Sequence, residues 1–437
     1  MTVRLALVGL LLRSVAASAA APPRELSLED ALALVDRQSP TLAEARARVE
    51  ESAGLSRQAL AKALPTLTAS GSYTRNSDQA SAPLGALFAL LGAKPPYPAD
   101  LVIQPLDVLS ASGTLRVPLF APTAWAETAA ARSSERSAAA SSRAARQDLR
   151  TSLVEAAFGA LAGEEVVTAS ERAVASAEEQ AAVAARALAA GTGVPLAVLE
   201  ARTEAVRRRQ DLLRAESDLE RARLSVGVLL GLDEPVRIPL ALPAPAPAAD
   251  PGALAEEAVA RRPELAAAQA GVLSAERELQ TAHLAVLPEL SAQASLFAQN
   301  VALPTGKEDG WRVVVELDWP LYDGGLRYGQ ARKAEGTLGA ARAALAANEV
   351  KVREEVLDAA RDLGVAVEGL SLAEEEVKLA GEAAKVARRG FAAGISGALD
   401  VLDANDRLYR AEIGLAEARA RLGIAQAALD RAVGRSA

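Results

Sequence analysis

Residues that could carry out chemistry are scarce in this chain of 437 residues. It has no cysteine, which excludes disulfides, thiolate metal sites, a cysteine nucleophile and an acylated N-terminal cysteine. His283 is the single histidine, and because one imidazole cannot build a metal site, we expect a solvated helix residue. No phosphate-binding glycine loop, histidine cluster or nucleophile motif is present in the sequence. We therefore predict that the protein is not an enzyme and uses no cofactor or metal.

The most suggestive polar pair is Asp400 with Asp403, three residues apart at the start of a predicted helix. That spacing places both carboxylates on one helix face. They have two interpretations. They can simply favour the positive end of the helix dipole, or copies of both from several chains can form an acidic ring that repels anions and attracts cations at an aperture.

Two glycine-containing turns precede such helix starts. Gly191, Gly193, Val194 and Pro195 form the first, and the second consists of Gly394, Ile395, Ser396 and Gly397. Glycine tolerates the positive φ that a tight reversal requires, so we expect the chain to reverse at both turns.

The elements around these turns are predicted to be long helices. Residues 123–190 contain no proline, and 68 helical residues would span about 100 Å. Apolar residues recur every seven positions in residues 338–391, 149–188, 212–226 and 408–429, which is the coiled-coil period. Half of the residues are hydrophobic but only 3% are aromatic, and the many alanines suit close helix packing. The formal charge of −8 disfavours a nucleic-acid partner.

The sequence also repeats itself. Pro40 and Leu42 are matched 223 residues later by Pro263 and Leu265, and Leu64-Pro65 by Leu287-Pro288 at the same offset. We assign residues 1–21 to a secretory signal peptide, 22–234 to the first repeat, 235–252 to a stiff proline-rich linker and 253–437 to the second repeat. Each repeat is expected to run helix, two short strands, long helix, tight turn, long helix.

Four segments alternate polar and apolar residues with period two: 66–73, 111–119, 290–299 and 311–319. Their length suits tilted membrane strands. Arg116, Glu316 and Asp318 would then face a lumen, and Tyr73, Trp311 and Trp319 would lie at the membrane interfaces. A soluble antiparallel sheet with one face exposed to water explains the alternation of the strands equally well.

The number of strands favours a membrane-spanning sheet over a soluble one. Four strands leave two open edges, which a bilayer does not tolerate, so a spanning sheet must close by association. Three copies give a twelve-stranded barrel. The predicted fold class is mainly α, with a long coiled-coil α-helical barrel and four strands per protomer that close as a trimeric membrane β-barrel. Residues 75–107 are the expected external loop.

Residues 27–75 and 254–300 resemble the duplicated start of the TolC-like outer membrane efflux proteins. Residues 391–404 resemble that family's helix-tip motif, and residues 191–201 resemble its weaker first-repeat form. The resemblance implies a homotrimer in the outer membrane that extends into the periplasm of a Gram-negative bacterium. It also implies docking to a periplasmic adaptor and an inner-membrane transporter, as the duct of a tripartite efflux or type I secretion system.

The family would place adaptor docking at the two turns together with Leu199 and Leu402, and the acidic ring at Asp400 and Asp403. Ala197 stands where the second repeat has Asp400, so each chain offers only one full acidic pair. The rival classes are a periplasmic adaptor and a structural coiled-coil protein. An adaptor normally has one hairpin rather than two, and a rod leaves the strand alternation unexplained.

Overall fold

The computed structural model describes residues 23–82, 90–92, 101–242, 250–301, 307–393 and 395–435. The proposed signal peptide, Gly394, parts of the 75–107 segment and parts of the linker lie outside these residues. The described chain is mainly helical, with a four-stranded sheet as its largest β element, as the sequence predicted. None of its described helices is long and apolar enough to cross a membrane.

The helices of the two halves match in length. In the first half they are α1 (Leu28–Gln38, 11 residues), α2 (Pro40–Ala61, 22), α4 (Pro122–Ala189, 68) and α5 (Pro195–Leu230, 36). In the second half they are α6 (Pro251–Arg261, 11 residues), α7 (Pro263–Leu284, 22), α8 (Leu326–Ala392, 67) and α9 (Ala398–Val433, 36). Each 11-residue helix ends just before a proline, because proline disfavours helical backbone in the residue that precedes it.

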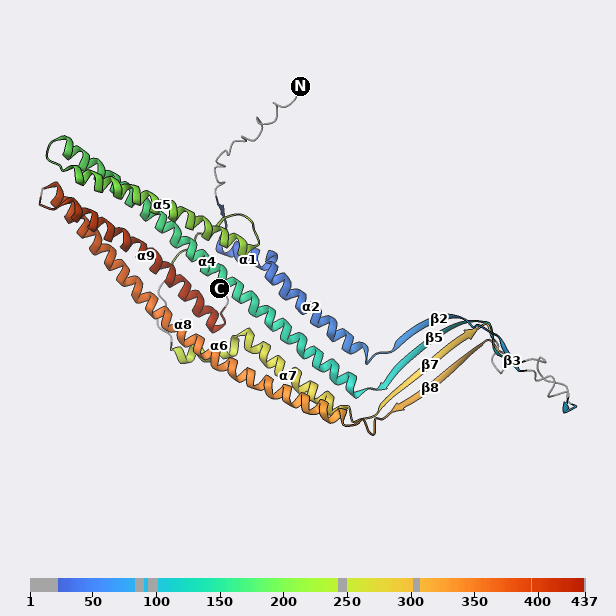
Figure 1. The fold of residues 1–437 in the computed structure, drawn as a ribbon. Coiled ribbons are helices and arrows are strands. Elements are labelled where there is room, and N and C mark those ends of the chain that lie inside the picture. The colour runs from blue at the N-terminus through green and yellow to red at the C-terminus, as the bar shows by residue number, and fades with distance from the viewer. Residues whose placement is uncertain are drawn as a thin grey trace, which may run out of the picture. The chain divides into compact units, whose positions relative to one another are not determined.

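The strands are β1 (Arg24–Glu25), β2 (Thr66–Arg75), β3 (Ala80–Ala82), β4 (Leu101–Gln104), β5 (Asp107–Phe120), β6 (Val236–Arg237), β7 (Glu289–Gln299) and β8 (Asp309–Asp318). All four predicted strands are present as β2, β5, β7 and β8. They form one antiparallel sheet in the order β2-β5-β7-β8 (Figure 1). β3 pairs with β4 within the segment predicted as an external loop.

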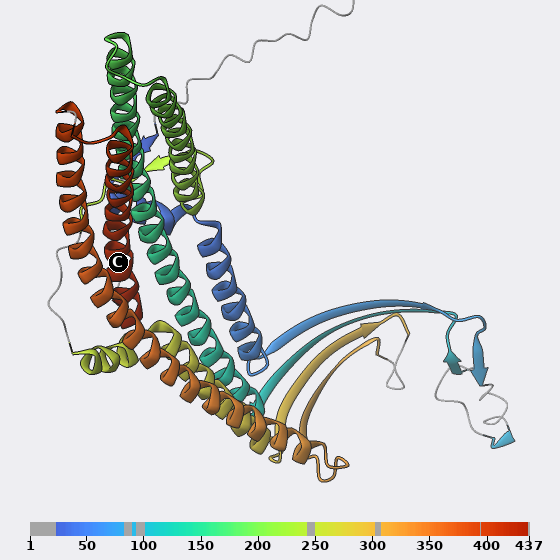
Figure 2. The same cartoon turned by 60° about the vertical axis from the view of Figure 1, so that its left-hand side comes forward.

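The described chain divides into two compact units, and each takes elements from both halves of the sequence. Unit 1 comprises the described residues within 1–45, 142–262 and 350–437, and unit 2 comprises those within 46–141 and 263–349. Within unit 1, α5, α4, α9 and α8 lie side by side in that order, and the two chain reversals lie at the same end (Figures 1 and 2).

One core cluster of unit 1 forms where short elements cover the long helices. Ala31 and Val35 of α1 pack with Leu153 of α4 and with Val226 and Leu230 of α5. Val236 of β6 joins them, and β6 pairs in parallel with β1. The first residues of the predicted linker therefore belong to a packed strand and its core, and only the rest of that segment connects the halves.

Candidate functional site

The turn between α4 and α5 is closed by backbone hydrogen bonds. The amides of Thr192 and Gly193 both donate to the carbonyl oxygen of Ala187, at 3.0 and 2.9 Å. Gly191 has a φ of +75°, as the prediction for a tight reversal requires. At Gly193, a Cβ atom would lie 2.6 Å from the backbone nitrogen of Leu188. Pro195 is the first residue of α5, where its missing N–H costs nothing.

In the turn between α8 and α9, the amides of Ile395 and Ser396 donate to the carbonyl oxygen of Gly390, at 2.8 and 3.2 Å. Gly397 is the N-cap of α9, and its amide donates to Oδ2 of Asp400 at 2.8 Å. The first interpretation of Asp400 is thus supported directly, because its carboxylate satisfies a helix-start donor. Asp403 lies 3.6 Å from Arg407 and is exposed.

The residues expected to dock a partner differ in exposure. Val194, Leu199 and Ile395 present large apolar side chains to solvent, and Ile395 is 84% exposed. Exposed apolar side chains that gather at one place are typical of interaction surfaces. Leu402 instead is half-buried and lines a cavity of about 220 Å³ among α4, α5, α8 and α9.

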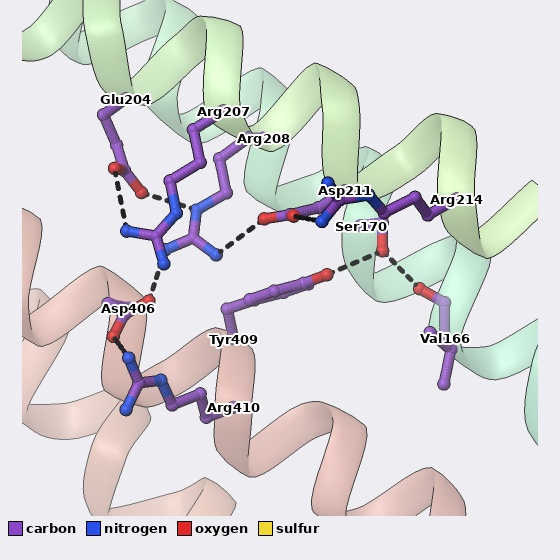
Figure 3. Close-up of polar contacts among 10 residues, drawn as sticks. All are labelled: Val166, Ser170, Glu204, Arg207, Arg208, Asp211, Arg214, Asp406, Tyr409 and Arg410. Atoms are coloured by element: carbon purple, nitrogen blue, oxygen red, sulfur yellow. Dashed lines mark hydrogen bonds and ion pairs between the residues drawn. The ribbon is translucent and has the colours of Figure 1, made fainter.

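That cavity borders a buried polar cluster, the Arg208 cluster (Figure 3), which joins α5 to α9 and α4. Arg208 is only 5% exposed. Its guanidinium forms ion pairs with Glu204 at 2.6 Å, with Asp406 of α9 at 2.5 Å and with Asp211 at 3.5 Å. The guanidinium also lies 4.6 Å from the ring centroid of Tyr409.

Tyr409 continues the cluster into α4. Its hydroxyl lies 3.1 Å from Oγ of Ser170, which donates to the carbonyl oxygen of Val166 at 2.8 Å (Figure 3). Burial alone would lower the pKa of Arg208, but the hydrogen bond to Asp406 and the surrounding carboxylates raise that pKa above its ordinary value. The guanidinium therefore stays charged, and its ion pair with Asp406 connects α5 to α9.

Sequence analysis did not identify the Arg208 cluster. A signal was available, because Arg208 occupies the same inward-facing series of α5 as Ala201, Ala205, Ala215 and Leu219, all of them buried. A charged residue at a core position of a heptad repeat is expensive unless it is paired. The adjacent Tyr409 follows Leu408, a member of the predicted α9 seam.

The three residues predicted to face a lumen lie on one face of the sheet in unit 2. Arg116, Glu316 and Asp318 all line a cavity of about 500 Å³ at the helix-side ends of the strands. Asp318 is directly opposite Glu289, and Glu316 is opposite Ser291. Lys62 and Glu127, 2.8 Å apart, line the same cavity. Side chains of both charges therefore line this cavity.

The three aromatic residues assigned to membrane interfaces are exposed on the single chain. Trp311 and Trp319 lie at opposite ends of β8, with Trp319 one residue beyond it. The hydroxyl of Tyr73 donates to Asp107 at 2.7 Å, and the indole of Trp319 donates to the carbonyl oxygen of Val286 at 3.2 Å. His283 is exposed in the last turn of α7, as expected. Among the described residues, no group of three or more His, Cys, Asp or Glu side chains could hold a metal ion.

A family model matches most of the chain. The family model described as outer membrane efflux protein matches residues 32–232 and 254–435. Protein CyaE of Bordetella pertussis (strain Tohama I) is 32% identical over 195 residues, which are 42% of this chain and 41% of that relative. The aligned region thus spans less than half the length of this curated relative.

Solved structures match over nearly the whole chain. The outer membrane protein VceC of Vibrio cholerae aligns with a TM-score of 0.76 at 21% identity, over 94% of this chain and 96% of that one. The CmeC outer membrane channel of Campylobacter jejuni gives a TM-score of 0.78 at 15% identity, over 93% and 85%. The MtrE outer membrane channel of Neisseria gonorrhoeae in its open state gives 0.75 at 19% identity, over 94% and 89%. At these identities the likeness concerns the fold.

Proposed function

The chain belongs to the outer membrane efflux protein family, and on that basis we propose that it is a passive export duct of the outer membrane. Three copies form a twelve-stranded barrel that is continued by a helical tunnel. The duct receives its cargo from a periplasmic adaptor and an inner-membrane transporter. It performs no bond chemistry.

The observation that carries this proposal is the four-stranded sheet. Both of its edge strands, β2 and β8, lack a further partner in the described chain, and apolar side chains such as Leu67, Val313 and Leu317 are exposed on it. A sheet of this kind is stable in a bilayer only when its edges are closed, and a cyclic trimer is the simplest closure. A soluble coiled-coil rod would not need such a sheet.

The turns are the proposed docking surface of the adaptor. Val194, Leu199 and Ile395 supply apolar contacts on rigid helix ends, which suits a helical partner that binds by side-chain packing. The glycines and Pro195 keep the reversals short, so that these side chains project from the end of unit 1. The mouth of the proposed duct lies between the three copies of this end.

Asp403 is the proposed principal carboxylate of an acidic ring at that mouth, and Asp400 adds to it while it caps α9. We expect Asp400→Asn with Asp403→Asn to raise single-channel conductance in planar bilayers and to abolish block by trivalent cations. The carbonyl oxygen of asparagine can still accept from Gly397, so the charge is removed while the cap is kept. A matched control is Glu50→Gln with Glu51→Gln, two exposed acids of α2. If trivalent cations block the double variant Asp400→Asn with Asp403→Asn as strongly as the wild type, the proposal of an acidic ring is wrong.

A further inference from the structure

Hydroxyl groups dominate the middle of the polar face of the four-stranded sheet, the face that the proposed duct turns to water. Thr68, Thr114 and Ser295 form one row across β2, β5 and β7, and Ser70 lies opposite Ser112 in the next row. Ser70 and Ser112 are hydrogen-bonded at 2.8 Å, and Thr114 and Ser295 at 3.3 Å. This part of the wall is therefore neutral, and its hydroxyls have partners within the sheet.

Phe297 interrupts this wall of hydroxyls. Its register in β7 places it on the polar face, opposite Ser112 of β5 and Gly310 of β8. Among the described residues of β2, β5, β7 and β8, it is the only aromatic residue on that face. The period of two that formed the strand predicts a polar residue here, so the ring needs another explanation.

The ring of Phe297 lies against Gly310 of the neighbouring strand. A Cβ atom at Gly310 would be 2.8 Å from Cζ of the ring and 3.2 Å from Cε2, so glycine leaves the space that the ring occupies. The ring thus lies along the wall of the proposed lumen instead of projecting across it. Covering a strand glycine with a ring also stabilises a sheet, but it uses one side of the ring. Phe297 is half-buried, and its other side is open to solvent.

Arg312 is the diagonal neighbour of Phe297 on the same face. Arg312 lies directly opposite Ser295, and Phe297 lies directly opposite Gly310. Diagonal neighbours of an antiparallel pair are about 7 to 8 Å apart, within reach of aromatic and long side chains. Arg312 is exposed, and it has no ion pair in the part of the chain that the structure describes. Its N–H donors are therefore available to a ligand beside the ring.

The positive charge of Arg312 is separated from the acidic residues of the same face. Glu289, Glu316 and Asp318 lie toward the helix-side ends of the strands. Glu316 is the nearest of them in β8, about 14 Å from Arg312 along the strand, which exceeds the Debye length of about 8 Å. Asp309, beside Gly310, belongs to the opposite face, where it pairs with Ala298. An anion next to Phe297 therefore meets Arg312 with little opposition.

We propose that Phe297 and Arg312 form a binding site for aromatic anions on the wall of the lumen, one in each copy of the chain. A ring of the ligand stacks on the open side of Phe297. The carboxylate or sulfonate of the ligand accepts hydrogen bonds from the guanidinium of Arg312. The site rests on the proposed duct, and it gives that duct a chemical preference for aromatic acids.

One exposed ring and one exposed guanidinium bind weakly, and weak binding suits a conduit. Passage requires contacts favourable enough to admit a cargo and weak enough to release it. The neighbouring hydroxyls of Ser112 and Ser295 already have partners, so they do not hold the ligand further. The site is therefore one at which cargo pauses rather than one at which it stays.

The test is block of single channels formed by the full chain in planar bilayers. The probe is pyrenetetrasulfonate, a planar aromatic anion, added on the side of the bilayer opposite the helices. The comparison is butanetetracarboxylate in mildly alkaline buffer, an anion of similar charge without a ring. We expect Phe297→Leu and Arg312→Gln each to raise the concentration of pyrenetetrasulfonate for half-block about tenfold, because each removes one stacking or one charge-assisted contact.

Two control variants make the same chemical changes on the other face of the sheet. Trp311→Leu removes a ring and Arg75→Gln removes a guanidinium there, and neither should alter the block. Block by butanetetracarboxylate should weaken in Arg312→Gln and stay unchanged in Phe297→Leu, because that anion can use only the charge. A heat-sensitive trimer band on a gel checks the assembly of each variant.

The outcomes separate the site from the duct. Equal block of the wild type, Phe297→Leu and Arg312→Gln by pyrenetetrasulfonate overturns the site and leaves the duct standing. Equal weakening of block by both anions in Phe297→Leu also overturns it, since the residue then acts through the shape of the sheet. Arg312→Gln changes only an exposed side chain, so it tests the site even if Phe297→Leu does not assemble. If the wild-type chain forms no channel, the duct fails and the site fails with it.

Discussion

At the scale of single residues, Arg208 shows how a buried charge is accommodated between helices. Every other buried member of its series on α5 is apolar, apart from Gly227, yet Arg208 has three carboxylates within ion-pair distance and an aromatic face beside it. Paired in this way, the guanidinium orients α9 against α5. An apolar residue at the same position would bury as much surface but would not define that orientation.

We predict that Arg208→Ala lowers the free energy of unfolding by about 3 kcal/mol, at the low end for a broken buried ion pair, because Glu204 and Asp406 lose their buried partner while Asp406 keeps its ion pair with Arg410 at 2.7 Å. The stability of Arg208→Lys should lie between that of the wild type and that of Arg208→Ala, since an ammonium cannot reproduce the planar contacts of a guanidinium. Thermal unfolding followed by circular dichroism measures both changes. Arg214→Ala is the control, since that side chain is 78% exposed and little change is expected. Equal effects of Arg208→Ala and Arg214→Ala would contradict this role.

Asp36 provides a prediction about pH. Hydrogen bonds from Arg146 lower the pKa of Asp36 to about 2; burial opposes this shift, and Arg150 assists it at 2.7 Å. Since the folded-state pKa is lower than that of the unfolded chain, the stabilisation is present above about pH 4 and is lost as pH falls through about 2.

Asp36→Asn should therefore destabilise the protein by about 1.5 to 3 kcal/mol at pH 7. Its unfolding temperature should converge with that of the wild type as pH falls to about 2. Asp218→Asn removes an exposed carboxylate that pairs with Arg221, and no comparable difference is expected. A difference in unfolding temperature between the wild type and Asp36→Asn that stays constant from pH 7 to about pH 2 would exclude the ionic explanation.

At the scale of elements, the strands place successive side chains on opposite faces of the sheet, with the apolar ones mainly on one face. Val313 and Val314 are neighbours in β8 with the same side chain, and the period of two places them on opposite faces. Val313 shares its face with Trp311, Val315 and Leu317, and Val314 shares its face with Arg312 and Glu316. The proposed barrel turns the first face to lipid and the second to water.

This pair gives a matched test. Val313→Lys should cost about 2 to 4 kcal/mol if it faces the bilayer, and Val314→Lys should cost about zero. The measurement is the fraction of chain recovered from outer membranes as a heat-sensitive trimer. Equal loss for both variants would contradict the two-environment sheet.

At the scale of the whole molecule, the two halves of the chain are interleaved. β5 of the first half pairs with β7 of the second in unit 2, and in unit 1 Arg208 of α5 pairs with Asp406 of α9, while Asp148 of α4 pairs with Arg431. The repeats read from the sequence are therefore not the units that fold compactly. Each compact unit needs both repeats.

We expect a protease site inserted in the proline-rich linker that the sequence predicts between the repeats to be cleaved without loss of the assembled protein, because the contacts between the halves do not depend on an uninterrupted chain. Either half expressed alone should fail to accumulate in the membrane, since each would leave half of the sheet unpaired. Gel filtration in detergent after cleavage measures the first outcome and membrane fractionation the second. Stable accumulation of one half would show that a repeat folds independently.

Periodic signals predicted most of this architecture. Heptads and the absence of proline located α4, and period-two alternation located β2, β5, β7 and β8 to within four residues at either end. The β1–β6 pair was missed, because two-residue strands have no measurable period and are fixed by packing over Leu153. Likewise, the sequence left two roles open for Asp400, and only the hydrogen bond from Gly397 shows that it caps α9.

The unpaired edges of the sheet have a genetic consequence. In the proposed trimer, β2 of each copy pairs with β8 of a neighbouring copy. One subunit with a defective strand therefore prevents the two normal subunits of its trimer from closing the barrel. If a cell makes equal amounts of normal and strand-defective chains that mix freely, only about one assembly in eight is wholly normal. Defects in these strands would then be dominant, whereas a variant that never reaches the membrane would be recessive.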